Sequence, residues 1–317
     1  MAKRLTAQEK TERWVTSEVT STFWIKTIEE SFSEVVLDEE DVERKIWLIQ
    51  ELLAEFQSID IFYGKDGFYG NTWNNYDGIR FTINNSKLKG GYLITNLSPA
   101  LICHSSRHER CDNCECCYAK ADERRHKHSA FNNLNNMMVV LDKDPKESAR
   151  ELAEKLTDGQ KEKIFWHRVN VNGEYWSPEC LKWAVAFCEA LYEYLPNLLG
   201  TYSYTHNKDL IHEDTGCIVM NWSFNNPHGT KRCITARKYD DCYLDSSKYA
   251  VCNGNCMKCS YCKDPNETRI IVFFEHGTKH IWKDEVPKWH KFEFAVRKWI
   301  DWLKFANRMG FDPYKTN

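Results

Sequence analysis

Apolar positions along the chain change their spacing at the boundary between two regions. In the first region they recur at steps of three and four residues, as at Val42, Ile46 and Ile49, and this period is typical of an amphipathic helix. Short apolar runs bounded by glycine and asparagine follow it. We therefore predict a helical N-terminal lobe or arm over residues 1–58 and a cysteine-rich domain over residues 59–317.

Strand-like and helix-like segments alternate through the second region. Asp144 and Ser177 each precede a proline, which is typical of helix starts, and the first of these two helices is expected to end near Gly159. Helical spacing also predicts helices over residues 131–141 and 287–309. Strands are predicted over residues 59–63, 78–83, 91–95, 164–171, 198–204, 217–222 and 270–274. This alternation predicts an α/β domain with a parallel sheet or a partial barrel.

Composition limits the classes of protein that fit this pattern. Hydrophobic residues make up 42% of the 317 residues and aromatics 14%, which is enough for a substantial core. The formal net charge of −3 gives no global attraction to nucleic acid or to an anionic membrane. Residues 1–20 lack the apolar segment of a secretory signal, and no apolar run is long enough to span a bilayer. We therefore expect a cytoplasmic protein without membrane contact, with its cysteines reduced.

Four of the fourteen cysteines fall within eleven residues, at Cys252, Cys256, Cys259 and Cys262. Thiolates this close in sequence can converge on one ion or cluster at little cost in loop closure. Structural zinc sites usually separate two Cys-x2-Cys pairs by roughly a dozen residues or more. The steps here are closer to the runs that hold an iron–sulfur cluster. The spacing favours a 4Fe–4S cluster over zinc, and unliganded thiols or disulfides are the third alternative.

A second group of cysteines is less regular, and comprises Cys103, Cys111, Cys114, Cys116 and Cys117. These thiols either form a second metal site or complete the first one. We take Cys103, Cys111, Cys114 and Cys117 as candidate metal ligands beside the four late cysteines. Four histidines lie near this group, and we interpret them as solvated polar residues, because a histidine without a fixed partner rarely ligates a metal.

The remaining cysteines are scattered along the chain. We interpret them as structural, and Cys188, which lies on the apolar stripe of its helix, as a small core residue. The scattered set is Cys180, Cys188, Cys217, Cys233 and Cys242.

Four segments resemble, in sequence and in order, a family of phage-encoded, radical-SAM-like proteins known by a gene-product number, gene product eighty-eight. The segments are YLITNLSPALICHSSRHERCDNCECCYAKADERRH from residue 92, FWHRVNVNGEYWSPECLKWAVAFCEAL from residue 165, GTYSYTHNK from residue 200 and VCNGNCMKCSYCKDPNETRIIVFFEHG from residue 251. The resemblance covers roughly residues 90–280.

The resemblance implies a partial TIM-type barrel, radical-SAM-like, with cysteines gathered at one mouth around a four-iron cluster. In that class a cysteine triplet holds the cluster, and Cys252, Cys256 and Cys259 are similar to it in spacing. A glycine-glutamate segment after the second strand approaches the amino group of S-adenosylmethionine. The residues here that look like that segment are Gly173 and Glu174.

These observations leave three candidate functions. Cys262 would close the iron site that S-adenosylmethionine needs, which favours a non-catalytic accessory protein that carries an iron–sulfur cluster and binds a host or phage macromolecule in the infected cell. The second hypothesis is a radical-SAM-type enzyme that cleaves S-adenosylmethionine. The third is a zinc-stabilised nucleic-acid-binding protein that uses the basic run 124–128, which otherwise is a solvated helix face. The sequence predicts no substrate, named partner or oligomeric state.

Overall fold

A computed structural model describes residues 44, 78–85, 88, 90–100, 103, 119, 123, 127–223, 233–236, 241–252, 254, 256 and 259–274. The predicted strand 59–63, the predicted helix 287–309 and all of the predicted lobe except Arg44 lie outside these residues. The chain divides into two compact units. The first unit comprises Met1–Arg80, Asn96–Asp144 and Asn172–Trp176, and the second comprises Phe81–Thr95, Pro145–Val171 and Ser177–Asn317.

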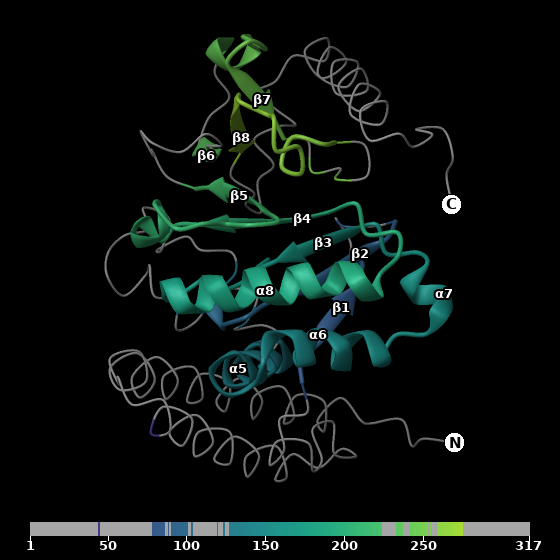
Figure 1. Cartoon of the computed structure of the whole chain (residues 1–317). Coiled ribbons are helices and arrows are strands. Elements are labelled where there is room, and N and C mark those ends of the chain that lie inside the picture. Colours follow the sequence, from purple (N-terminus) through teal and green to yellow (C-terminus); the bar gives the residue numbers. More distant parts are fainter. Residues whose placement is uncertain are drawn as a thin grey trace, which may run out of the picture. The chain divides into compact units, whose positions relative to one another are not determined.

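The second unit contains a five-stranded sheet whose strand order follows the chain order (Figure 1). β1 (Phe81–Ile83) pairs antiparallel with β2 (Tyr92–Thr95), and parallel pairing continues from β2 onward. The other strands are β3 (Trp166–Val169), β4 (Gly200–Thr205) and β5 (Ile218–Trp222). Each strand overlaps a predicted run. The predicted α/β class and parallel sheet are confirmed.

The two faces of this sheet are built differently, because successive residues of a strand point to opposite sides. One side, the helix face, carries His167 of β3 and Thr201 of β4. Phe187 of the following helix packs there, with its ring centroid 6.2 Å from that of His167. The other side, the loop face, carries Trp166 and Tyr202, which belong to one buried cluster. The loop face is therefore the aromatic side of the sheet.

Two helices pack against each other on one side of the sheet (Figure 1). They are α6 (Pro145–Glu154) and α8 (Pro178–Tyr194). As the sequence predicts, Ser177 caps α8, and its hydroxyl oxygen accepts a hydrogen bond from the Cys180 N–H at 3.2 Å. Both helices bury small and aliphatic residues, which allows a close approach.

The predicted continuation of the first helix to Gly159 is wrong. α6 ends at Glu154, and a separate helix, α7 (Asp158–Lys161), begins after Thr157. Thr157 and Gln160 form a capping box, in which the Gln160 N–H donates to the Thr157 hydroxyl at 3.3 Å and the Thr157 N–H donates to the Gln160 side chain at 2.9 Å. This box starts a new helix where the periodicity alone suggested an uninterrupted one.

A second, three-stranded sheet also lies in the second unit. Its strands are β6 (Cys233–Ala236), β8 (Ile270–Phe274) and β7 (Tyr249–Val251), in that spatial order and all parallel. Two short 3-10 helices, η3 (Lys208–Leu210) and η4 (Asp241–Leu244), occupy connections. The described strands form two separate sheets and no closed barrel. The rings of Tyr204 in β4 and Phe273 in β8 meet with centroids 5.8 Å apart.

The first unit contains α5 (Lys127–Asp142), which confirms the helix predicted over 131–141. Buried asparagines on this helix bind the backbone of extended segments. Asn136 donates to the carbonyl oxygens of Arg80 and Asn96 at 2.9 and 2.7 Å, and its own side-chain oxygen accepts from the Arg80 N–H. These bonds satisfy backbone polar groups of Arg80 and Asn96. Among the described residues, every helix is too short or too polar to cross a bilayer.

Candidate functional site

The four late cysteines lie in the connection from β7 to β8. We call residues 252–264 the cysteine loop. The Cys252 N–H donates to the Val272 carbonyl at 2.8 Å, so the loop leaves the sheet in a fixed direction. Gly254 then adopts a positive φ of 73°, which favours glycine. Its N–H donates to the Cys252 sulfur at 3.4 Å, a contact that stabilises a thiolate.

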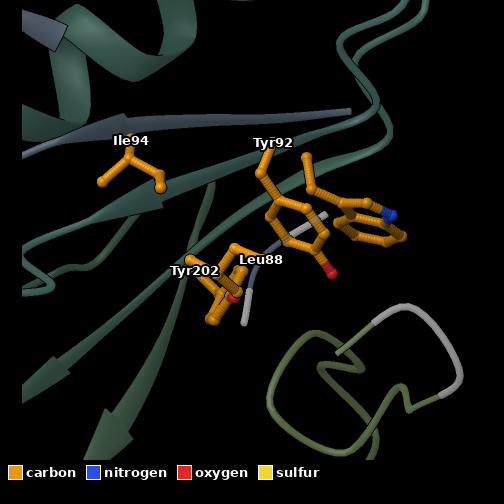
Figure 2. Close-up of a cluster of buried hydrophobic side chains, with 5 residues drawn as sticks. Leu88, Tyr92, Ile94 and Tyr202 are labelled. Atoms are coloured by element: carbon orange, nitrogen blue, oxygen red, sulfur yellow. The ribbon is translucent and has the colours of Figure 1, made fainter. Parts of the chain in front are cut away.

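Two side chains of the five-stranded sheet, Tyr92 and Asn221, bind the cysteine loop, and Lys263 of the loop itself joins the first of these contacts. The Cys256 carbonyl accepts hydrogen bonds from the Tyr92 hydroxyl at 2.9 Å and from the Lys263 ammonium at 3.0 Å. The Cys262 carbonyl accepts from the Asn221 amide at 3.0 Å. Figure 2 shows the Tyr92 hydroxyl pointing toward the olive-coloured loop. The loop is thus fixed through two of its backbone carbonyls.

Beneath the loop lies a buried aromatic cluster, defined by Tyr92, Trp166 and Tyr202 with Leu88 and Ile94. Figure 2 shows Tyr92, Tyr202 and their aliphatic neighbours together beside the sheet. Half-buried cysteines from the loop, Cys256 and Cys262, pack against this cluster. The loop therefore sits on a low-dielectric surface, where charges interact strongly.

Lys263 is a buried cation at this surface, with 4% of its area exposed. Its Nζ donates to the Tyr92 hydroxyl at 2.9 Å and lies 4.4 Å from the centroid of the Trp166 ring, within the range of cation–π attraction. Burial lowers the pKa of Lys263 to about 8, and the charges of Cys259, Cys256 and Cys262 oppose that shift. The ammonium group thus lies in the field of three cysteine sulfurs.

A second cation, Arg168, lies on the same face. Its guanidinium carbon is 4.9 Å from the centroid of the Tyr204 ring and 5.8 Å from that of Tyr202. Tyr204 and Cys262 pack against the same buried cluster, and Tyr204 lowers the pKa of the Cys262 thiol. The cysteines of the loop therefore lie near two cations held by aromatic rings, Lys263 of the loop and Arg168 of the sheet, a setting that suits an anionic group.

The four thiols of the loop influence one another. Burial of the Cys262 sulfur raises its pKa well above the usual range, and the charges of Cys259, Cys252 and Cys256 raise it further, against the effect of Tyr204. Nevertheless, within the described part of the chain, no three histidine, cysteine, aspartate or glutamate side chains converge closely enough to hold a metal ion. The donor set, four thiols within eleven residues, suits a metal–thiolate centre.

The structure describes only Cys103 among the predicted ligands of the early cysteine group. Cys103 is half-buried in the first unit, and its N–H donates to the Ala100 carbonyl at 3.2 Å. Cys111, Cys114 and Cys117 lie outside the described residues. No disulfide joins any of the cysteines that the structure describes.

Gly173 and Glu174 form a packed turn in the first unit. Gly173 has a φ of 81°, and a Cβ atom there would lie 1.9 Å from the Ser98 carbonyl oxygen. The Glu174 N–H donates to the Ser98 hydroxyl at 3.0 Å, and that hydroxyl donates to the Glu174 carbonyl at 2.7 Å. The Glu174 side chain accepts from the Tyr175 N–H and is 2% exposed. These contacts place both residues against Ser98, and their predicted approach to S-adenosylmethionine stays a prediction.

Comparisons with models of protein families, with curated proteins and with solved structures found no match to this chain. The site is therefore defined by its own residues. Lys263, Tyr92 and Arg168 are the side chains that the sequence did not single out. The position of Lys263 directly after Cys262 was the one local signal, whereas Tyr92 and Arg168 reach the loop only through the sheet.

Proposed function

We propose that this chain is a phage-encoded iron–sulfur protein of the infected host cytoplasm, and that its cysteine loop holds a 4Fe–4S cluster. In this proposal the cluster stabilises the fold, and the protein acts as a non-catalytic accessory factor that binds a host or phage macromolecule. The observation that carries the proposal is the attachment of the four-cysteine loop, through backbone carbonyls, to an aromatic surface, with one cation on the sheet and one in the loop against the rings.

The surroundings of the loop support a negatively charged metal centre. Clusters held by four thiolates are anionic, and backbone N–H groups that point at sulfur stabilise them. The Gly254 N–H already points at Cys252. Lys263 and Arg168 supply positive charge on the loop face. A cluster bound by four thiolates supplies a structural cross-link or a one-electron centre, and it keeps no open iron site.

We also propose that the five-stranded sheet belongs to a partial TIM-type barrel of the radical-SAM-like kind. The support is the parallel pairing of β2 through β5 in chain order, with α8 and α6 on one side and the cysteine loop on the other. Barrels of this type bury their interior face and carry helices outside.

The position of Cys256 favours the accessory role over cleavage of S-adenosylmethionine. Its carbonyl is bound by Tyr92, the first residue of β2, and by Lys263, which stacks on Trp166, the first residue of β3. Barrel enzymes place reactive groups at the opposite, carboxyl ends of their strands. The Cys262 carbonyl is bound by Asn221, near the carboxyl end of β5, so it is the position of Cys256, near the amino ends, that supports a structural centre.

Oxygen-free purification followed by iron, sulfide and zinc analysis tests the proposal. The expected protein is brown and contains iron and sulfide. Cys262→Ala should lose iron and unfold at lower denaturant concentration, because it removes one thiolate ligand. Cys242→Ala is the matched control: this cysteine is exposed and lies outside the loop, and the variant should keep its iron.

Two outcomes contradict the accessory-cluster proposal. Colourless protein with stoichiometric zinc would support the zinc-stabilised nucleic-acid-binding alternative, for which charge removal at Arg124 and Arg125 should flatten the salt dependence of binding. A Cys262→Ala variant that keeps its iron, and that releases 5′-deoxyadenosine from S-adenosylmethionine after reduction, would support the enzyme alternative.

A further inference from the structure

A second pair of cysteines lies on the helix face, far in sequence from the cysteine loop. Cys188 is fully buried on α8 and Cys217 is half-buried, directly before β5. The two thiols are close enough for each to shift the pKa of the other. The Cys188 sulfur also lies 3.7 Å from Nδ1 of His167. Cys188 is the core residue that the sequence predicts, but its partnership with Cys217 was not predicted.

The backbone explains why these two thiols meet. Gly216 has a φ of 49°, and a Cβ atom there would lie 2.4 Å from the Val185 side chain and 3.3 Å from the Glu189 carboxylate. Val185 and Glu189 are one turn apart on α8, and Cys188 lies on that same turn. The segment before β5 therefore rests on α8 at the level of Cys188.

An ion pair and the strand register support the same placement. The Lys182 ammonium on α8 lies 4.0 Å from the Glu213 carboxylate, in the connection that leads to Cys217. Ile218 is paired with Thr201 in the sheet, and the Thr201 hydroxyl lies 3.5 Å from His167 Nδ1. The ion pair before Cys217 and the strand pairing after it thus hold this segment close to Cys188.

The two thiols differ in reactivity. Burial raises the pKa of Cys188 well above its usual range, and Cys217 raises it further. Cys188 lowers the pKa of Cys217, although burial and Glu189 oppose that shift. A half-exposed thiol with a lowered pKa attacks disulfides first, and a buried neighbour completes the exchange.

We propose that Cys188 and Cys217 form a reversible disulfide by exchange with a low-molecular-weight disulfide of the glutathione type. The Cys217 thiolate attacks one sulfur of the small disulfide, which gives a mixed disulfide and releases one small thiolate. The Cys188 thiolate then attacks the Cys217 sulfur and releases the second small thiolate. The two cysteine protons pass to the two departing thiolates. The protein pair is oxidised and the small disulfide is reduced, with no other reactant required.

This site is independent of the cysteine loop, which lies on the other face of the sheet. A disulfide here would join α8 covalently to the start of β5. Formation depends on the ratio of oxidised to reduced glutathione, so the pair would respond to the redox state of a reducing compartment while the cysteine loop keeps its own chemistry.

Peptide mapping by mass spectrometry tests the proposal on the full-length protein in glutathione buffers of rising oxidation. The expected product is a peptide pair linked through Cys188 and Cys217, with a mass lower by two hydrogen atoms. Treatment with excess reduced glutathione should abolish it. Cys188→Ser should stop the reaction at a stable glutathione adduct on Cys217, and Cys217→Ser should leave Cys188 unmodified.

Cys180→Ser is the matched control, because Cys180 is also buried on α8 and the linked peptide should form unchanged. The proposal fails if native wild-type protein never yields the linked peptide in fully oxidised buffer, a result that does not depend on any variant folding. It also fails if Cys188→Ser shows no increase in the adduct on Cys217. Neither result bears on iron content, so failure here is distinct from failure of the cluster proposal.

Discussion

The two faces of the five-stranded sheet both carry cysteines, but the groups around those cysteines differ. On the helix face Cys188 lies beside His167, whose Nε2 is 2.9 Å from the Thr95 hydroxyl and whose other nitrogen faces the thiol, and the charge of Glu189 raises the pKa of that thiol further. On the loop face the cysteines lie beside the cation Lys263. Thiols beside a neutral histidine are suited to exchange with each other, whereas thiols beside a cation are suited to hold a charged group as thiolates.

The largest effect is expected when one large aromatic side chain is truncated on each face. Tyr202→Ala on the loop face and Phe187→Ala on the helix face should each lower the free energy of unfolding by about 3–5 kcal/mol, because both side chains are fully buried. Denaturant titration of metal-free protein measures this. Only Tyr202→Ala should also reduce iron binding, measured in buffer without denaturant. Equal loss of iron in both variants would show that the faces are not distinct.

A pH experiment sharpens the description of His167 on the helix face as neutral. Burial lowers the pKa of His167 from 6.5 to about 3. Below pH 6.5 the unfolded chain binds a proton that the folded chain excludes, so the stabilising contribution is complete above pH 6.5 and is lost as the pH falls toward 3. Between pH 7 and pH 5 this single group should cost about 2 kcal/mol of stability.

His167→Gln is the comparison that isolates this contribution, because glutamine keeps hydrogen-bonding groups but does not titrate. Urea unfolding at pH 7 and pH 5 should show a smaller loss in the variant than in the wild-type protein, by about 2 kcal/mol. An identical pH dependence in the two proteins would mean that His167 is solvated or charged in the folded state.

The smallest test concerns the attachment of the cysteine loop. Tyr92→Phe removes the hydroxyl that donates to the Cys256 carbonyl and accepts from Lys263, and should cost about 1 kcal/mol. Hydrogen exchange of the loop amides should become faster, and exchange in α8 should stay unchanged. Tyr249→Phe, on a half-buried strand residue outside the loop, is the control. Faster exchange in α8 as well would indicate a global effect.

Features of the two faces that are local in the chain could be predicted from the sequence. The cysteine loop was evident because its four thiols are adjacent in the chain, and Ser177 marked the start of α8 because capping is local. Strands β6 and β7 were missed, since segments of three or four residues carry too little periodicity. The Thr157–Gln160 capping box was not predicted, and neither was the end of α6 before it.

Contacts that depend on the sheet could not be predicted. Tyr92, Lys263 and Asn221 come from three distant segments, and only strand register brings the first and last of them to the cysteine loop. Cys188 and Cys217 likewise meet because Gly216 approaches α8 closely. A pattern in one sequence records the period of a helix or strand, but not which residues of different elements become neighbours.

β7 and β8 run parallel and are joined by the cysteine loop. Parallel neighbours normally need a long crossover, most often a helix that supplies its own rigidity. In this chain the return path has no such helix among its described residues, and its shape is fixed by bonds to another sheet. Cleavage of the cysteine loop, or a rearrangement of its sulfur atoms, would therefore release one end of β8. The strand pairing of the three-stranded sheet would then be disturbed directly.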